Sequence, residues 1–219
     1  MNLPFDVGQF FDVFTRYNVA VWPAQVLLTG MAFGAVVLAL RPRPWSDRVV
    51  SGILAFLWLW MGGVYHLGFF RSINPVAAVF GALFLLEGIA LAVLGAWGRK
   101  LRFRFRPTVR ATLGALLIGF ALVAYPLLGR ASGHLYPAAP TFGLPCPTTI
   151  FTLGLLLWAE PPIPWPLLTV PLAWSAVGTS AALQLGVRED LELAIAGLVS
   201  ALVVSLPRLG RARLRGRPC

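Results

Sequence analysis

The sequence is poor in charged residues, above all acidic ones, and in cysteine. Charged side chains make up 12% of its 219 residues, with 8 acidic residues, 2 cysteines and 2 histidines in all. Soluble domains carry ~25% charged residues, so a water-soluble globular domain is excluded. Two cysteines exclude a scaffold built on several disulfides. A disordered chain is excluded because such chains are polar rather than apolar.

Short catalytic and metal-binding signatures are missing as well. The chain contains no G-x-S-x-G, no H-E-x-x-H and no glycine-rich phosphate loop. It has no C-x-x-C or H-x-x-x-H pair that would fix two metal ligands locally. No internal repeat of the length expected for a transporter built from tandem halves is evident. The chemistry of the chain therefore has to be inferred from where its few polar residues lie.

Long apolar runs dominate what is present. Hydrophobic residues make up 58% of the chain and the mean hydropathy is +0.78. A transmembrane helix needs ~20 mostly apolar residues, and we predict an all-α, polytopic membrane helix bundle with about seven transmembrane helices, forming one domain over 19–207. The fifth run rises only ~20 Å, so it either spans the membrane or is re-entrant. The seven runs cover 19–40, 49–70, 75–97, 111–128, 147–159, 164–185 and 191–206.

The basic residues predict the orientation. Of the 18 basic residues, 17 are arginine, and seven spans place fourteen of them on one face and four on the other. Cytoplasmic loops carry the excess of arginine, so we expect the N-terminus outside and the C-terminus in the cytoplasm, with a basic cytoplasmic tail over 208–219. The arginine clusters should bind anionic lipid headgroups, and we do not expect nucleic acid as a partner. The four residues on the outer face are Arg16, Arg71, Arg130 and Arg188.

Residues 1–18 form a separate amphipathic segment. Leu3, Val7, Phe10, Phe11 and Phe14 recur at helical spacing. This pattern predicts an N-terminal interfacial helix that lies on the outer membrane surface. The alternative is a lid over an outward-facing cavity.

One carboxyl group lies deep within an apolar run. Glu87 is twelve residues into the third run, near mid-membrane. A charge there is costly, so the side chain needs a partner or a bound proton. It is interpreted either as a proton or cation carrier or as a neutral group that hydrogen-bonds a neighbouring helix.

Several polar side chains should meet at the outer level. His66 lies near the outer end of the second run, His134 in a loop, and Cys146 at the start of the fifth run. A thiolate with two imidazoles suits a soft or borderline metal ion such as zinc or copper(I); the alternative is a buried structural cysteine with two histidines that bind loop carbonyls. We expect one outward-facing pocket, roofed by the loop through Tyr136 and Phe142. Its predicted lining is Trp22, Gln25, Tyr65, His66, Asn74, Glu87, His134, Tyr136, Cys146, Thr148 and Thr149.

Two stretches carry a resemblance to a known family. One begins Pro4-Phe5-Asp6 and continues through Gln9-Phe10-Phe11, Tyr17-Asn18 and Trp22-Pro23-Ala24-Gln25; the other holds Gly133-His134, Tyr136-Pro137, Phe142-Gly143 and Pro145-Cys146-Pro147-Thr148-Thr149. Both resemble a family of small polytopic bacterial inner-membrane proteins of unknown function, sometimes loosely labelled permeases. The resemblance implies a bacterial inner (cytoplasmic) membrane location and a transport role.

Three functions remain open from the sequence. The first is a transporter or permease for a small solute or ion, based on the spans, Glu87 and the outer polar cluster. The second is a membrane-embedded enzyme or a metal- or redox-handling protein that uses Cys146 with His66 and His134. The third is an accessory structural subunit without a substrate.

Overall fold

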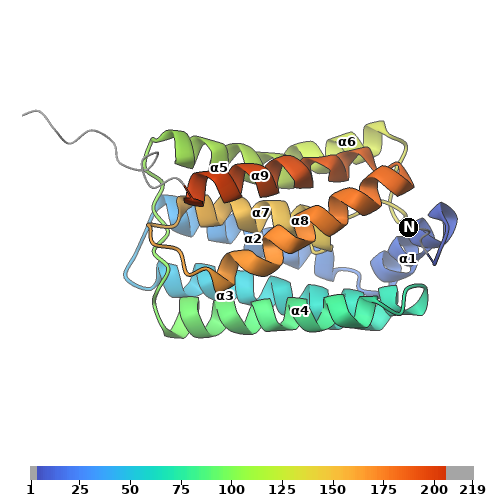
Figure 1. The fold of residues 1–219 in the computed structure, drawn as a ribbon, viewed down its shortest axis with the longest axis horizontal. Coiled ribbons are helices and arrows are strands. Elements are labelled where there is room, and N and C mark those ends of the chain that lie inside the picture. The colour runs from blue at the N-terminus through green and yellow to red at the C-terminus, as the bar shows by residue number, and fades with distance from the viewer. Residues whose placement is uncertain (1–3, 206–219) are drawn as a thin grey trace, which may run out of the picture.

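A computed structural model describes residues 4–205, and over this range the chain is a bundle of helices without extended strands (Figure 1). The predicted all-α class is confirmed for these residues. The predicted tail over 208–219 lies outside them. The elements are α1 Val7–Ala20, α2 Ala24–Leu40, α3 Ser46–Trp60, η1 Met61–Phe69, η2 Phe70–Ser72, α4 Ala77–Ala90, η3 Leu91–Trp97, α5 Val109–Gly119, η4 Phe120–Ala124, α6 Tyr125–Ala131, α7 Pro145–Trp158, α8 Pro166–Leu185, η5 Arg188–Leu191 and α9 Glu192–Ser205.

The longer helices run between two ends of the molecule. In Figure 1, α1 and the loop before α7 lie at one end, and the connections before α3 and before α5 lie at the other. Three of the long segments continue from α-helix into π-helical turns, η1, η3 and η4. Such turns are rare and frequently mark functional sites. The η1 turn carries Tyr65 and His66.

Four helical segments are long and apolar enough to cross a membrane, namely Ser46–Ser72, Ala77–Trp97, Val109–Ala131 and Pro166–Leu185. A fifth span results if α1 and α2 are counted together. The described part of α9 and the whole of α7 have 14 residues each, a rise of ~21 Å against a bilayer core of ~30 Å. The structure therefore supports several membrane-spanning helices but not the full seven predicted.

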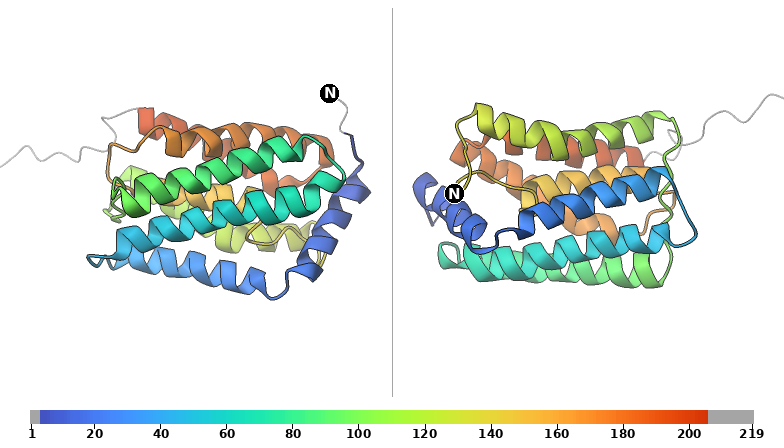
Figure 2. Two further views of the ribbon diagram at one scale, coloured as in Figure 1. Left: turned by 90° about the horizontal axis from the view of Figure 1, so that it is seen from below. Right: turned by 180° about the vertical axis from the view of Figure 1, so that it is seen from behind.

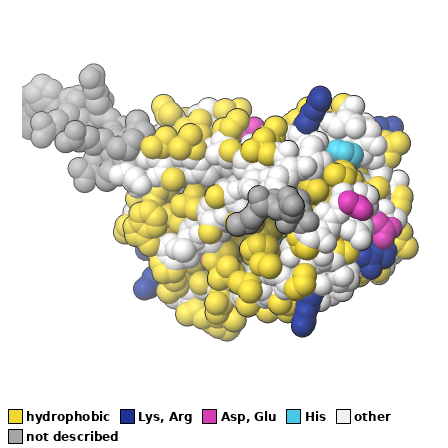
Figure 3. All heavy atoms as spheres, turned by 45° about the vertical axis from the view of Figure 1, so that its right-hand side comes forward, with side chains coloured by type: hydrophobic (Ala, Val, Ile, Leu, Met, Phe, Trp, Pro, Cys, Tyr) yellow, Lys and Arg dark blue, Asp and Glu magenta, His cyan; other side chains and the backbone are white. Residues whose placement is uncertain are grey.

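The outer surface of the bundle is apolar. Leu86 is 60% exposed, Leu116 64% and Leu183 69%, each on a different candidate span. Figure 3 shows hydrophobic side chains over much of the visible face. Soluble monomers rarely expose large contiguous apolar patches, so this surface fits contact with lipid.

The N-terminal helix packs against one end of the bundle. Asp6 and Gln9 form a capping box at the start of α1. Pro23 cannot continue the helix because it lacks an N–H group, and α2 leaves at 86° to α1 (Figure 2). Phe10 and Phe14 of α1 are buried in a cluster with residues of η1 and η2. The apolar face of α1 therefore packs on the bundle, as a lid requires, and its position on a membrane surface stays a prediction.

The fifth predicted run, α7, is the central helix of the bundle. All its residues except Cys146 are buried, and it contacts α5, α8 and α9. Gly114 and Gly154 allow α5 and α7 to approach, because a Cβ on Gly114 would lie 2.7 Å from the Gly154 carbonyl oxygen. Trp58 of α3 donates a hydrogen bond of 3.1 Å to Thr152. α7 is therefore enclosed by protein on every side.

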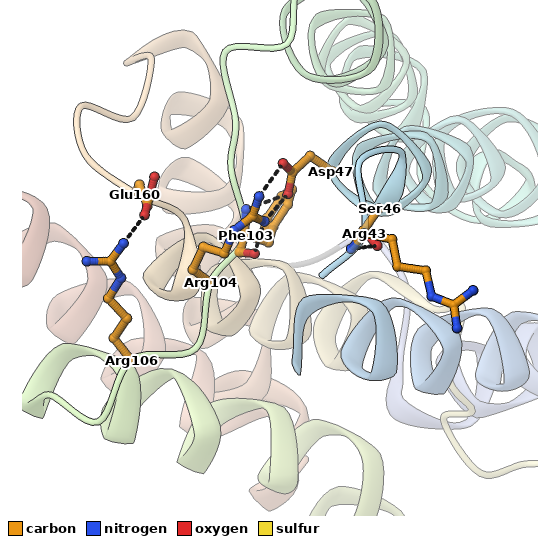
Figure 4. Close-up of polar contacts among 7 residues, drawn as sticks. All are labelled: Arg43, Ser46, Asp47, Phe103, Arg104, Arg106 and Glu160. Carbon is orange, nitrogen blue, oxygen red and sulfur yellow. Dashed lines mark hydrogen bonds and ion pairs between the residues drawn. The ribbon is translucent and has the colours of Figure 1, made fainter. Parts of the chain in front are cut away.

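Ion pairs hold the end of the bundle opposite α1 (Figure 4). Arg104 donates to both carboxylate oxygens of Asp47, at 2.7 and 3.1 Å, and Arg106 donates to Glu160 at 2.8 Å. The N–H of Phe103 also binds Asp47, and the Phe103 ring is fully buried. Two arginines of the predicted lipid-binding cluster thus pair with carboxylates of the protein itself.

Candidate functional site

A cavity of about 600 Å³ lies at the end of the bundle that carries α1. Its walls come from α1, from the start of α4, from α8, from the start of α7 and from η5. Small-molecule sites are typically of this size, largely apolar, with a few polar groups that orient the ligand. The aromatic residues of the lining are Phe5, Phe10, Phe14, Tyr65, Phe70, Phe80, Tyr125 and Trp174.

Aromatic side chains of the N-terminal segment roof the cavity. Phe5 and Phe10 stack with ring centroids 5.9 Å apart, and Phe10 meets Phe14 edge to face at 4.6 Å. Phe5 also meets Phe70 at 5.5 Å. Such pairs contribute ~0.5–1.5 kcal/mol each beyond the area they bury. The roof is therefore formed mainly by the N-terminal segment. The predicted loop contributes Pro140 and Leu144, but Tyr136 and Phe142 do not line the cavity.

The floor carries a buried carboxyl group. Asp190 of η5 is 4% exposed and lines the cavity. The Tyr125 hydroxyl donates to Asp190 Oδ1 at 2.5 Å, and the Cys146 thiol also hydrogen-bonds this carboxyl group. Trp174 is 9% exposed, and its Nε1 lies beside the Cys146 thiol. Acid, phenol, thiol and indole groups thus meet at one point of an apolar cavity.

Burial raises the pKa of Asp190 to about 7. Hydrogen bonds from Tyr125 and Cys146 favour the charged form and oppose this change. The neighbouring Glu189 carboxylate raises the pKa further, and His134 lowers it. The Asp190 carboxyl group can therefore gain or lose a proton near neutral pH.

A second carboxylate ties the roof to the floor. The side chain of Glu189 is fully buried and lies 2.6 Å from Nδ1 of His134. The His134 ring packs on Phe11 of α1, with centroids 4.5 Å apart. The loop before α7, η5 and α1 are thereby joined at this side of the cavity. His134 does not line the cavity itself.

The second histidine lies in the wall of the bundle. His66 Nδ1 is 2.9 Å from the Met61 carbonyl oxygen, and its ring packs on Phe84 at 4.5 Å and on Trp174 at 5.3 Å. His66 is fully buried and does not line the cavity, whereas Trp174 does. The indole of Trp174 therefore separates His66 from the Cys146 side of the cavity.

The expected shared site of His66, His134 and Cys146 is not formed. Among the residues that the structure describes, no three His, Cys, Asp or Glu side chains are grouped to hold a metal ion. Each histidine instead has its own partner, the Met61 carbonyl oxygen or the Glu189 carboxylate. The zinc or copper(I) site and the enzyme based on these three residues have no structural support.

Glu87 is buried, as its depth in the apolar run suggested, but the predicted hydrogen bond to a neighbouring helix is not formed. It is 1% exposed, and neither carboxyl oxygen has a hydrogen-bond partner within residues 4–205. Phe84 lies one helical turn before it, a rise of ~5 Å, and touches His66. Glu87 does not line the cavity.

The other predicted pocket residues divide between the cavity and its surroundings. Tyr65 and Asn74 line the cavity together with Cys146. Trp22 is 61% exposed and meets Tyr136 at 6.2 Å. The remaining residues lie outside the cavity: Gln25 donates to the Asn18 carbonyl oxygen, Thr148 accepts from the Gly143 N–H, and Thr149 is fully buried.

Sequence reasoning missed Asp190, Tyr125 and Trp174. Tyr125 and Trp174 lie in apolar runs where they look like ordinary core residues. Asp190 belongs to the run Arg188-Glu189-Asp190 between two apolar segments, which resembles a solvated turn. The turn that holds Glu189 and Asp190 is short. Its length could have indicated that at least one of the two adjacent carboxylates packs against the helices.

Residues 7–215 match a sequence family described as "Family of unknown function (DUF6064)". This agrees with the expected likeness to an uncharacterised family, but it carries no statement on membrane location or bacterial source. No curated protein and no solved structure matches the chain.

Proposed function

Because the chain belongs to the DUF6064 family, whose function is unknown, we propose a function from the cavity: an integral membrane permease for a small solute with an apolar body and a cationic group. Asp190 at the floor of an aromatic cavity is the observation that carries this proposal. A buried carboxylate needs a counter-charge, and Tyr65 and Trp174 offer ring faces that attract cations.

Unpartnered polar groups in the bundle support transport rather than binding alone. His66 Nε2, the Glu87 carboxyl oxygens and the hydroxyls of Ser51, Thr149 and Ser200 are buried without hydrogen-bond partners among residues 4–205. Ionisable groups within membrane helices are costly and mark the pathways of substrates, ions and protons. In a permease that alternates between two conformations, these polar groups would find hydrogen-bond partners in the second conformation.

The proposed topology has seven crossings, with α1 outside. It is supported by connections that alternate between the two ends (Figure 1) and by the excess of basic residues at the end opposite α1. The bacterial inner membrane and anionic headgroups at the arginine-rich end are part of this proposal. The described basic residues at that end are Arg41, Arg43, Arg48, Arg99, Lys100, Arg102, Arg104, Arg106 and Arg110.

Binding and uptake of labelled benzyltrimethylammonium by the full chain in proteoliposomes test this function. The wild type should bind the cation saturably and accumulate it, and Asp190→Asn should lose both activities. Glu192→Gln is the matched control, since it removes a carboxylate two residues away that does not line the cavity. Binding without accumulation would refute transport, and absence of saturable binding would refute the cationic solute.

A further inference from the structure

The residues that line the cavity differ in exposure according to the side on which they lie. Those of α1, α7 and η5 are buried, apart from the half-buried Cys146. The exposed lining residues of α8 lie on a single face of that helix, because they recur at i, i+1, i+4 and i+8. The exposed lining residues are Pro4, Val76 at the start of α4, and Ala176, Val177, Ser180 and Gln184 of α8.

The end of the cavity toward α1 is closed. Phe10 and Phe14 lie over it and are 8% and 4% exposed. The Asn18 side chain binds the loop before α7 by donating to the carbonyl oxygens of Pro137 and Ala139, at 2.6 and 2.8 Å. Aromatic packing and these two hydrogen bonds therefore hold the roof in place, and the roof blocks an approach along the bundle axis.

The exposed side of the cavity lies between two candidate membrane spans, α4 and α8. The two helices touch where Trp174 meets Phe80 and Phe84, with ring centroids 5.3 and 5.0 Å apart. Beyond that contact α8 runs obliquely away from α4 toward the end that carries α1 (Figure 1). Val76 and Val177, on the two sides of this opening, are 52% and 39% exposed.

We infer that the cavity receives its ligand sideways from the membrane, through the mouth between α4 and α8, and that the ligand is a cationic amphiphile with an alkyl chain. This inference rests on the proposed function, which supplies the cationic group. Asp190 lies at the floor of the cavity and the apolar rim faces the hydrocarbon region of the membrane. A bound amphiphile places its cationic group on Asp190 and its chain along the aromatic wall toward the mouth.

The chemistry of the rim fits passage of an alkyl chain. The two polar side chains on the α8 face satisfy each other, because Gln184 donates to the backbone oxygen and to the hydroxyl of Ser180, at 3.1 and 3.2 Å. Within residues 4–205, Asp190 is the only charged side chain that lines the cavity. A charged headgroup therefore meets no competing ion pair before it reaches the floor.

Stopped-flow binding of decyltrimethylammonium to the full chain in nanodiscs tests the lateral path. Val177→Trp, which fills the mouth, should slow association and dissociation together by tenfold or more and leave Kd unchanged. Leu183→Trp is the matched control, since Leu183 lies on the same helix, is 69% exposed and does not line the cavity; its rates should stay within twofold of the wild type. Val76→Trp on the opposite rim is a second, independent block, and thermal unfolding shows whether each variant is folded.

The length of the alkyl chain distinguishes the source of the ligand. At one free aqueous concentration, decyltrimethylammonium reaches a higher mole fraction in the bilayer than octyltrimethylammonium, so its association rate should be higher in proportion. Equal association rates for the two cations at one free aqueous concentration would overturn the lateral path. Wild-type rates in folded variants at both rim positions would overturn it as well, and saturable binding would still support the proposed function. If neither decyltrimethylammonium nor benzyltrimethylammonium binds to the wild type, the proposed function itself fails.

Discussion

Replacement of the buried carboxyl group at the cavity floor should change how stability depends on pH. Asp190→Asn keeps the size of the side chain and its capacity to accept a hydrogen bond from Tyr125, but it removes the titration. Burial raises the pKa of Asp190 from 3.8 to about 7 in the folded protein. Between these values the folded protein binds the proton more tightly than the unfolded chain does. The stabilisation from this group is therefore complete below pH 3.8 and lost as the pH rises through about 7.

The size of the effect follows from the two pKa values. A change from 3.8 to about 7 corresponds to about 4 kcal/mol of differential stability. The difference in unfolding free energy between Asp190→Asn and the wild type should therefore shift by about 4 kcal/mol in favour of the variant as the pH rises from 4 to 8. For a chain of this size the gain corresponds to roughly 10 °C in Tm. Glu189 and His134 face the same carboxyl group but are present in both proteins, so the comparison isolates Asp190.

Thermal unfolding of wild type and Asp190→Asn in one detergent, over a pH series, measures the difference. Asp12→Asn is the control, because the Asp12 side chain is 66% exposed and carries no comparable burial; its Tm should follow that of the wild type throughout. A Tm difference between wild type and Asp190→Asn that stays constant within about 2 °C across the series would refute the role assigned to burial.

Three further outcomes are expected. Gly114→Ala should lower stability by ~1–3 kcal/mol, because its Cβ would lie 2.7 Å from a backbone oxygen of α7; Gly119→Ala on the same helix meets open space and should unfold at the wild-type temperature or above. Arg110→Gln should cost ~1–3 kcal/mol, because Arg110 donates to two backbone oxygens at the end of α7, at 3.1 and 2.9 Å; wild-type unfolding would contradict this. In a cysteine-free background, an impermeant thiol reagent on intact cells should label Ser132→Cys but not Arg102→Cys, and equal labelling would exclude the proposed orientation.

Helix positions were predictable because their signals are local. The third run was expected over 75–97 and is found as Ala77–Trp97, and the sixth was expected over 164–185 and is found as Pro166–Leu185. Apolar length and the prolines and charges at each end determine these limits without reference to the rest of the chain. The proline that breaks the first run, Pro23, is an equally local signal. A count of apolar residues alone does not detect it.

The site depends on contacts between distant segments, and these were not predictable. His66 and Cys146 were expected to meet, but Trp174, far along the chain, lies between His66 and the cavity. Asp190 resembles a turn residue in the sequence, and its burial arises only because η5 packs on α6 and α8, where Tyr125 reaches its carboxyl group. Periodicity shows that α1 has an apolar face, but whether lipid or protein covers that face is decided by Phe70 and its neighbours.

The enclosed position of α7 has a consequence for biogenesis. α7 is synthesised after α5 but before α8 and α9, and it contacts all three. While the chain is still being made, the surface of α7 that α9 later covers is open to lipid or to the insertion machinery. The centre of the protein is thus completed only when α9 is in place. A chain that stops before Glu192 would insert its earlier helices but would lack part of its core. One side of α7, a short segment that contains threonines, would then be uncovered and open to recognition by membrane quality control.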